Sequence, residues 1–230
     1  MRHTVLFGMV LALAGWMLVS CGNAENRAAE TDTPTDYTQH SADTAGTEPS
    51  DTDPDAADSA ADRTSFADKS VLVAYYSATG NTQTAAEYIA QQTGGTLFAI
   101  TPVSPYTAAD LDYNDSASRV STEHNDPDSR DVALETTTVE DFADYDVVFL
   151  GYPIWWGEAS WVVNDFVTEN DFTGKTVIPF ATSASSGIGT SDTDLAALSG
   201  TGEWLAGKRF SSRVGADEIA DWLAELPLEQ

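Results

Sequence analysis

Four short segments of the chain are apolar at nearly every position, and segments with a helical repeat separate them. The apolar segments are residues 71–76, 96–100, 146–152 and 175–181. Continuous apolar runs of this length are typical of strands that are buried on both faces of a parallel sheet. A fifth strand is expected between Glu203 and Val214, where the apolar pattern is weak.

Apolar residues recur at helical spacing between these strands. The pattern predicts helices over residues 84–92, 161–167, 192–198 and 216–226, whereas residues 107–125 are polar and show only weak helical character. Strands that alternate with helices indicate right-handed βαβ units and an α/β fold, a doubly wound parallel sheet with helices on both faces. Ligands bind such sheets beyond the carboxyl ends of the strands. The candidate loops are therefore those after Tyr76, Tyr152 and Ala181.

The first 21 residues have the pattern of a secretory signal. Arg2 supplies a positive charge, residues 4–19 are nearly all apolar, and small residues precede Cys21. This resembles a bacterial lipoprotein signal, whose cysteine is lipidated and becomes the mature N-terminus; an uncleaved membrane anchor is the alternative. Both interpretations predict that the rest of the chain lies outside the cytoplasmic membrane, and the first predicts a cell-membrane lipoprotein.

Residues 22–65 are dominated by Asp, Glu, Thr, Ala, Ser and Pro, and residues 44–62 contain no aromatic residue and no Val, Ile or Leu. Such a segment buries too little apolar area to offset the entropy lost on ordering. We expect a disordered acidic linker, either a functional spacer or surface filler. Composition changes near Phe66, so the folded domain is expected over residues 66–230.

The net charge and the single cysteine exclude several functions. The formal charge of -27 argues against nucleic-acid binding, which requires Lys and Arg to neutralise phosphates. One cysteine excludes an intramolecular disulfide and cysteine-ligated iron–sulfur or zinc-finger sites. His124 is expected to be a solvated loop residue without a role, and we predict no metal site.

The first loop combines hydroxyls, an amide and a glycine just before a predicted helix. It consists of Ser77, Ala78, Thr79, Gly80, Asn81 and Thr82. Free N–H groups and the helix dipole favour an anion there, so we expect it to hold a phosphate; an ordinary capped helix start is the alternative. It carries no Lys or Arg, unlike a P-loop, and lacks the G-x-G-x-x-G fingerprint of dinucleotide sites.

Residues 73–89 resemble the phosphate-loop signature of flavodoxins. An aromatic residue is followed two positions later by Ser or Thr, then by Gly-x-Thr, and Ala and Ile follow along the next helix. The matching residues are Tyr75, Ser77, Gly80, Thr82, Ala86 and Ile89. Ala74 departs from the signature, in which a larger apolar residue is usual.

The second loop, residues 151–158, contains Pro153, Ile154, Trp155, Trp156 and Gly157. A planar isoalloxazine ring would stack on an indole and bury apolar area on both sides. Gly157 would let the backbone change conformation and offer the reduced ring a hydrogen bond. The alternative is that the two Trp residues pack into the core.

The third loop is rich in hydroxyls and glycine, and its candidate residues are Thr182, Ser183, Ser185, Ser186 and Gly187. Its backbone N–H groups would surround the polar edge of the ring and stabilise charge there. A flexible turn is the alternative.

Residues 145–157 and 174–183 together resemble a flavodoxin-like branch with Gly-Tyr-Pro-Ile-Trp-Trp-Gly, followed by Gly-Lys-Thr-x-x-Pro-Phe-x-Thr-Ser. The resemblance implies a five-stranded parallel sheet in the order 2-1-3-4-5 and non-covalent FMN. It leaves the reaction open, because one fold hosts many functions.

Electron transfer is the favoured function, with a redox partner that has a basic docking face. The alternative is an FMN-dependent NAD(P)H:quinone-type oxidoreductase acting on a quinone-like acceptor, although no nicotinamide-binding motif is present. A module that has lost its flavin is a third class, which the intact loops disfavour. No catalytic acid or base is predicted. Glu158 and Asp165 are expected to be solvated charges at helix starts.

Overall fold

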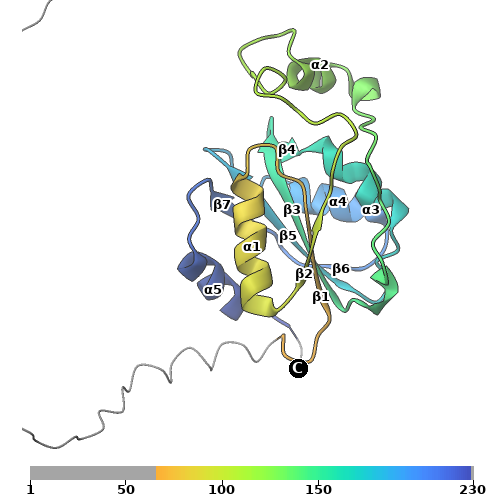
Figure 1. Cartoon of the computed structure of the whole chain (residues 1–230), viewed down its shortest axis with the longest axis vertical. Coiled ribbons are helices and arrows are strands. Elements are labelled where there is room, and N and C mark those ends of the chain that lie inside the picture. The colour runs from red at the N-terminus through yellow and green to blue at the C-terminus, as the bar shows by residue number, and fades with distance from the viewer. Residues whose placement is uncertain (1–65, 229–230) are drawn as a thin grey trace, which may run out of the picture. The chain divides into compact units, whose positions relative to one another are not determined.

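The central sheet is parallel, and the structure, a computed structural model, describes residues 66–228 around it (Figure 1). The strand order is β2 (Thr96–Ala99), β1 (Val71–Tyr75), β3 (Val147–Trp155), β5 (Thr176–Ser183) and β6 (Glu203–Trp204). Because β4 lies off this path, β5 and β6 are the fourth and fifth parallel strands, and the predicted order 2-1-3-4-5 is confirmed. The predicted lipidation site Cys21 and the predicted linker over residues 22–65 lie outside the described residues.

The fifth position of the sheet is shared by two short strands. β6 pairs with Thr176 and Val177 at the beginning of β5, and β7 (Lys208–Ser211) pairs with residues 180–183 at its end. Two pieces of two and four residues are each too short to show a clear apolar pattern. Their shortness explains why the sequence marks this strand poorly.

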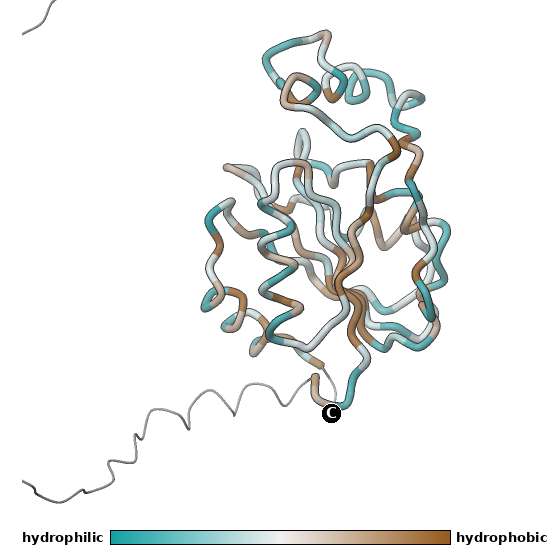
Figure 2. The backbone as a smooth tube through the Cα atoms, viewed as in Figure 1, coloured by the Kyte–Doolittle hydropathy of each residue, from teal (hydrophilic) through white to brown (hydrophobic). Residues whose placement is uncertain are grey.

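Helices cover both faces of the sheet. α1 (Asn81–Thr93) and α5 (Ala216–Ala224) lie on one face, and α4 (Ser191–Ser199) and α3 (Asn164–Glu169), with the 3-10 turn η4 (Trp161–Val163) before it, lie on the other (Figure 1). Along β1, Val71 and Val73 pack in the core under α1 and α5, whereas Leu72 and Ala74 pack in the core under α3 and α4. Successive strand residues point to opposite faces, so a strand covered on both sides is apolar throughout (Figure 2).

Some element boundaries differ from those predicted. α1 begins at Asn81, three residues early, so the last two residues of the first loop lie in its first turn. β3 continues to Trp155 because the chain reverses and pairs antiparallel as β4 (Glu158–Ala159). The prediction that Pro153, Ile154 and Trp155 lie in a loop was therefore wrong.

A long excursion, residues 100–146, leaves β2 at the carboxyl end of the sheet and returns to the beginning of β3 (Figure 1). It carries the short helix α2 (Arg119–Asn125) and the 3-10 turns η2 (Pro127–Ser129) and η3 (Phe142–Asp144), and it is largely hydrophilic (Figure 2). Among residues 66–228, no helix has the length and apolar character needed to cross a membrane.

Candidate cofactor site

The three predicted loops meet around two adjoining pockets at the carboxyl ends of β1, β3 and β5. The first pocket has a volume of about 300 Å³ and is lined by Ala78, Thr79, Asn81, Leu111, Tyr113, Pro153, Ile154, Trp155, Thr182, Ser183, Ala184 and Ser212. The second has a volume of about 390 Å³ and is lined by Tyr113, Ile154, Trp156, Ser183, Ala184, Ser185 and Ser186. The shared residues make them one continuous candidate site.

The first loop presents a helix start that its own side chains leave uncapped. Gly80 is the N-cap of α1 at φ 87°, and no side chain caps the first turn. The hydroxyl of Ser77 is buried without a hydrogen-bond partner within residues 66–228. A buried hydroxyl without a partner is costly, and the first N–H groups of a helix attract anions. These features fit a phosphate at this position.

Thr82 links the first loop to the third. Its side chain is 1 % exposed, and its hydroxyl lies 2.8 Å from that of Thr182. It lines neither pocket, so its direct effect is to fix the distance between the ends of β1 and β5. The amide of Asn81 donates to the Thr79 hydroxyl at 3.1 Å and orders the exposed part of the loop.

The two adjacent Trp residues have different environments. Trp155 is buried and packs edge-on against Tyr76 and Trp161, so for this residue the core alternative describes most of its contacts. Trp156 is 38 % exposed and lines the second pocket with Tyr113, whose ring centroid lies 4.6 Å away. Of the two Trp residues, only Trp156 offers a large, partly exposed aromatic surface to a planar ring.

The turn that carries Trp156 is strained. Trp156 and Gly157 have φ values of 49° and 84° and form a two-residue connection between β3 and β4. Positive φ at both positions is typical of a type I′ hairpin turn, which normally takes Asn or Gly at the first position. For a residue such as Trp, the left-handed conformation costs about 1–2 kcal/mol. Surrounding contacts must hold it there.

Ser183 anchors the third loop to the fifth strand position. Arg209 in β7 donates from Nε to the Ser183 hydroxyl at 2.8 Å and from Nη2 to the Ser183 carbonyl at 2.9 Å. The Ser183 hydroxyl donates in turn to the carbonyl of Ser186. Ser185 and Ser186 line the second pocket, whereas Gly187 is exposed and lines neither pocket.

Four lining residues were not predicted from the sequence: Leu111, Tyr113, Ala184 and Ser212. Leu111 and Tyr113 come from the excursion, where Tyr113 is the sole aromatic residue of residues 107–125 and thus the signal that could have revealed it. Burial raises the pKa of the Tyr113 phenol to about 12. The phenol is therefore a neutral hydrogen-bonding group at physiological pH.

A buried carboxylate fixes the excursion to the rest of the domain. Glu123 in α2 accepts hydrogen bonds from the Tyr106 hydroxyl at 2.6 Å, Trp161 Nε1 at 2.8 Å and Arg119 Nε at 2.7 Å. Burial and then the bond to Glu123 raise the pKa of Tyr106. Donors from the excursion, from α2 itself and from η4 satisfy one carboxylate, which ties α2 to η4.

The prediction that His124 is a solvated loop residue was wrong. His124 lies in α2, is partly buried, and stacks on Trp156 with a centroid distance of 4.5 Å and an interplanar angle of 10°. Arg130 Nη2 lies 3.5 Å from its Nδ1. The Glu123 contacts hold this imidazole against Trp156, which lines the second pocket.

Glu158 and Asp165 have different positions from each other, and neither lines the two pockets. Glu158 starts no helix, contrary to the prediction, but lies in β4 and pairs with Arg130 at 2.8 Å. Asp165 lies in the first turn of α3, and its pKa is raised by burial and then by nearby Asp131 and Glu169.

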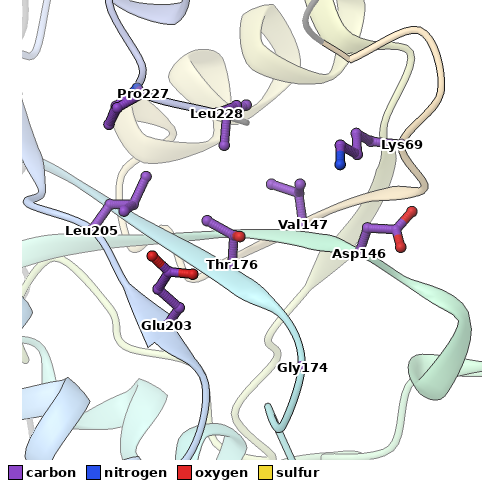
Figure 3. Close-up of a pocket in the computed structure, with 9 residues that line it drawn as sticks. All are labelled: Lys69, Asp146, Val147, Gly174, Thr176, Glu203, Leu205, Pro227 and Leu228. Carbon is purple, nitrogen blue, oxygen red and sulfur yellow. The ribbon is translucent and has the colours of Figure 1, made fainter. Parts of the chain in front are cut away.

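A third pocket of about 340 Å³ lies at the opposite end of the sheet (Figure 3). Its lining comes from the beginnings of β3, β5 and β6, from Lys69, and from Pro227 and Leu228 near the C-terminus. One of its carboxylates, Asp146, already accepts from the backbone N–H of Ser70 at 2.8 Å. Parallel sheets bind ligands at the carboxyl ends of their strands, so this pocket is not the candidate site.

Comparisons with known proteins agree on one family. The family model described as Flavodoxin matches residues 70–226. A protein from Bacteroides eggerthii described as a flavoprotein is 45% identical, with 67% of this chain and 96% of that chain covered and a TM-score of 0.61. A second one, from Bacteroides uniformis, is 41% identical, with 68% and 99% covered and a TM-score of 0.63.

More distant is a flavoprotein from Lactobacillus acidophilus in complex with FMN. It is 18% identical, with 68% of this chain and 99% of that chain covered and a TM-score of 0.49. The comparison with curated proteins gave no match.

Proposed function

Because the chain belongs to the flavodoxin family, we propose that it binds FMN and carries electrons outside the cytoplasmic membrane. The supporting observation is the convergence of three loops on one continuous site. An uncapped helix start and the orphaned Ser77 hydroxyl lie in its first loop, and the partly exposed Trp156 lies in its second. Bound FMN supplies one- and two-electron chemistry, and the protein sets its position and its potential.

Different residues of the site suit different chemical parts of the cofactor. Ser77, Thr79, Asn81 and the first N–H groups of α1 suit the phosphate, because they are neutral donors at the positive end of a helix dipole. Trp156, Tyr113 and Ile154 offer apolar surface to the ring. Ser183, Ser185 and Ser186 form the polar side of the second pocket and suit the edge of the ring that carries its oxygen and nitrogen atoms.

The charge of the domain acts against reduction of the ring. From Phe66 onward the chain has 26 Asp and Glu residues against 7 Lys and Arg residues. Adding negative charge to the flavin in this field is unfavourable, so the potential for the second electron is low. Salt screens the field over about 10 Å at 0.1 M, so the potential rises with ionic strength.

An electron carrier of this charge suits a partner with a basic face. Around Tyr113, which lines the site, Asp112 and Asp115 are exposed and Asp110 is partly exposed. Opposite charges accelerate association in a salt-dependent manner. The runner-up function is a reductase of quinone-like acceptors, for which a flat molecule would have to reach the ring beside Trp156.

The extracytoplasmic location rests on the sequence before the folded domain. The apolar segment that ends at Cys21 would direct export and lipidation, and the acidic residues 22–65 would separate the domain from the membrane. A Cys21→Ser chain that stays in the membrane fraction and incorporates as much labelled fatty acid as wild type would contradict the lipid anchor.

Stepwise reduction of the full chain, followed by its visible spectrum, tests the proposal. We expect the purified protein to be yellow or to bind added FMN with quenching of flavin fluorescence. A colourless protein that FMN does not reconstitute would refute FMN binding and the carrier with it. Rapid bleaching by NAD(P)H alone, with turnover of a quinone, would instead favour the reductase.

A further inference from the structure

The Trp156–Gly157 turn is held by the excursion on both of its sides. Before the turn glycine, the His124 ring stacks on Trp156 at 4.5 Å and 10°. After it, Arg130 Nη1 lies 2.8 Å from Glu158 Oε2. Both contacts come from residues 119–130, which include α2 and the residue after η2. This one segment therefore contacts the residues on both sides of Gly157.

This segment is itself rigidly attached. Arg130 donates from Nε to the carbonyl of Glu123 and from Nη2 to the carbonyl of His124, each at 2.9 Å. Its guanidinium lies 4.7 Å from the ring centroid of Trp161. Because the Glu123 carboxylate also binds Trp161, α2 and the beginning of η4 form one connected unit. Movement of the turn would disturb that unit.

The conformation that these contacts hold is one that Trp rarely adopts, with φ at 49°. The turn also faces the site. Trp156 lines the second pocket, and the Gly157 carbonyl oxygen is 3.1 Å from the position that a Cβ on Gly189 would occupy. Through Trp156, the turn therefore borders the pocket proposed for the flavin ring.

We propose that His124 and Arg130 are positioning residues that set the reduction potential of bound FMN by fixing the Trp156–Gly157 turn; this rests on the proposed FMN binding. A fixed turn cannot re-aim its peptide dipoles when an electron adds charge to the ring. A released turn can, and it then stabilises the reduced cofactor relative to the oxidised one. Loss of either contact therefore raises the potential.

The test compares His124→Ala and Arg130→Gln with wild type in the full chain. Asn125→Ala, an exposed position next to His124 in the same helix, is the matched control. His124→Phe keeps an aromatic ring for stacking and removes the imidazole nitrogens. The readouts are the potential of FMN measured with redox mediators, the FMN dissociation constant, and hydrogen exchange of residues 154–160 in the FMN-free protein.

We expect His124→Ala and Arg130→Gln to shift the ratio of affinities for one-electron-reduced and oxidised FMN about tenfold, which raises that potential by about 59 mV. Exchange across the turn should be faster in both variants, and Asn125→Ala and His124→Phe should match wild type. Wild-type potentials in both contact variants, with FMN bound, would overturn this inference alone. Failure of wild type to bind FMN would overturn the proposed function as well.

Discussion

Replacing Glu123 by Ala should destabilise the protein by several kcal/mol, although Glu123 lies outside both pockets. The substitution removes the acceptor of three hydrogen bonds. Two of the donors are buried, since Tyr106 is 8% exposed and Trp161 is 3% exposed. A buried donor left without a partner costs about 1–3 kcal/mol, so the two together cost about 2–6 kcal/mol.

Arg119 contributes less to this loss. Its side chain is 26% exposed, so water can solvate the guanidinium once the carboxylate is gone. Partly exposed ion pairs contribute about 0–1 kcal/mol. We therefore expect a total near 4 kcal/mol, at the centre of the range set by the two buried donors.

Urea unfolding of the full chain measures this loss, and two further variants apportion it. Tyr106→Phe removes one donor and leaves the carboxylate two partners, so it should cost only about 1 kcal/mol. Glu123→Gln keeps one acceptor oxygen and should fall between the two. A loss below about 1 kcal/mol for Glu123→Ala would refute the view that this carboxylate anchors the excursion, because one unpaired buried donor alone should cost that much.

Three other substitutions test separate parts of the structure. Thr82→Val removes the hydroxyl that contacts Thr182. It should raise the FMN dissociation constant in a fluorescence titration about tenfold, or about 1.4 kcal/mol, while the circular dichroism spectrum stays unchanged. Unchanged affinity would mean that the first loop has been misinterpreted. Burial lowers the pKa of Lys175, so the folded state binds fewer protons than the unfolded state, and wild type should gain stability over Lys175→Met as urea unfolding is repeated from pH 8 to pH 10. Because the pKa of Asp165 is raised in the folded state, its protonation favours folding, and this stability is lost as pH rises through the folded pKa. The free energy of unfolding of Asp165→Asn should therefore increase relative to that of wild type from pH 3 to pH 6. A constant difference would contradict the raised pKa.

The sheet could be predicted from the sequence because inner strands such as β1 and β3 are covered on both faces, although the edge strand β2 is largely exposed. The burial of every residue of β1 leaves a continuous apolar run that is readable without the structure. The end of β3 could not be predicted in the same way. A type I′ turn is normally marked by Asn-Gly or Asp-Gly, and Trp156 at its first position hides the hairpin, so Pro153 to Trp155 look like a loop.

The excursion shows where local patterns stop being informative. His124 and Trp156 are stacked although 32 positions separate them in the sequence. Glu123 binds Trp161 across 38 positions. The polar sequence around α2 contains no periodic signal that would predict these contacts, because they depend on how the segment folds back over the carboxyl end of the sheet. The prediction of a solvated His124 failed for that reason.

The first loop contains no Lys or Arg, which suits the proposal that this acidic domain binds both a phosphate and a partner with a basic face. Cations placed in the loop would offset the carboxylates of Asp110, Asp112 and Asp115 around Tyr113, which we expect to steer the partner. Helix N–H groups and hydroxyls instead act at short range, so they bind the phosphate without altering the field at longer distance. Screening by salt should then have opposite effects on the two interactions. It should strengthen the binding of an anionic cofactor, which the domain repels, and weaken the docking of a cationic partner, which the domain attracts.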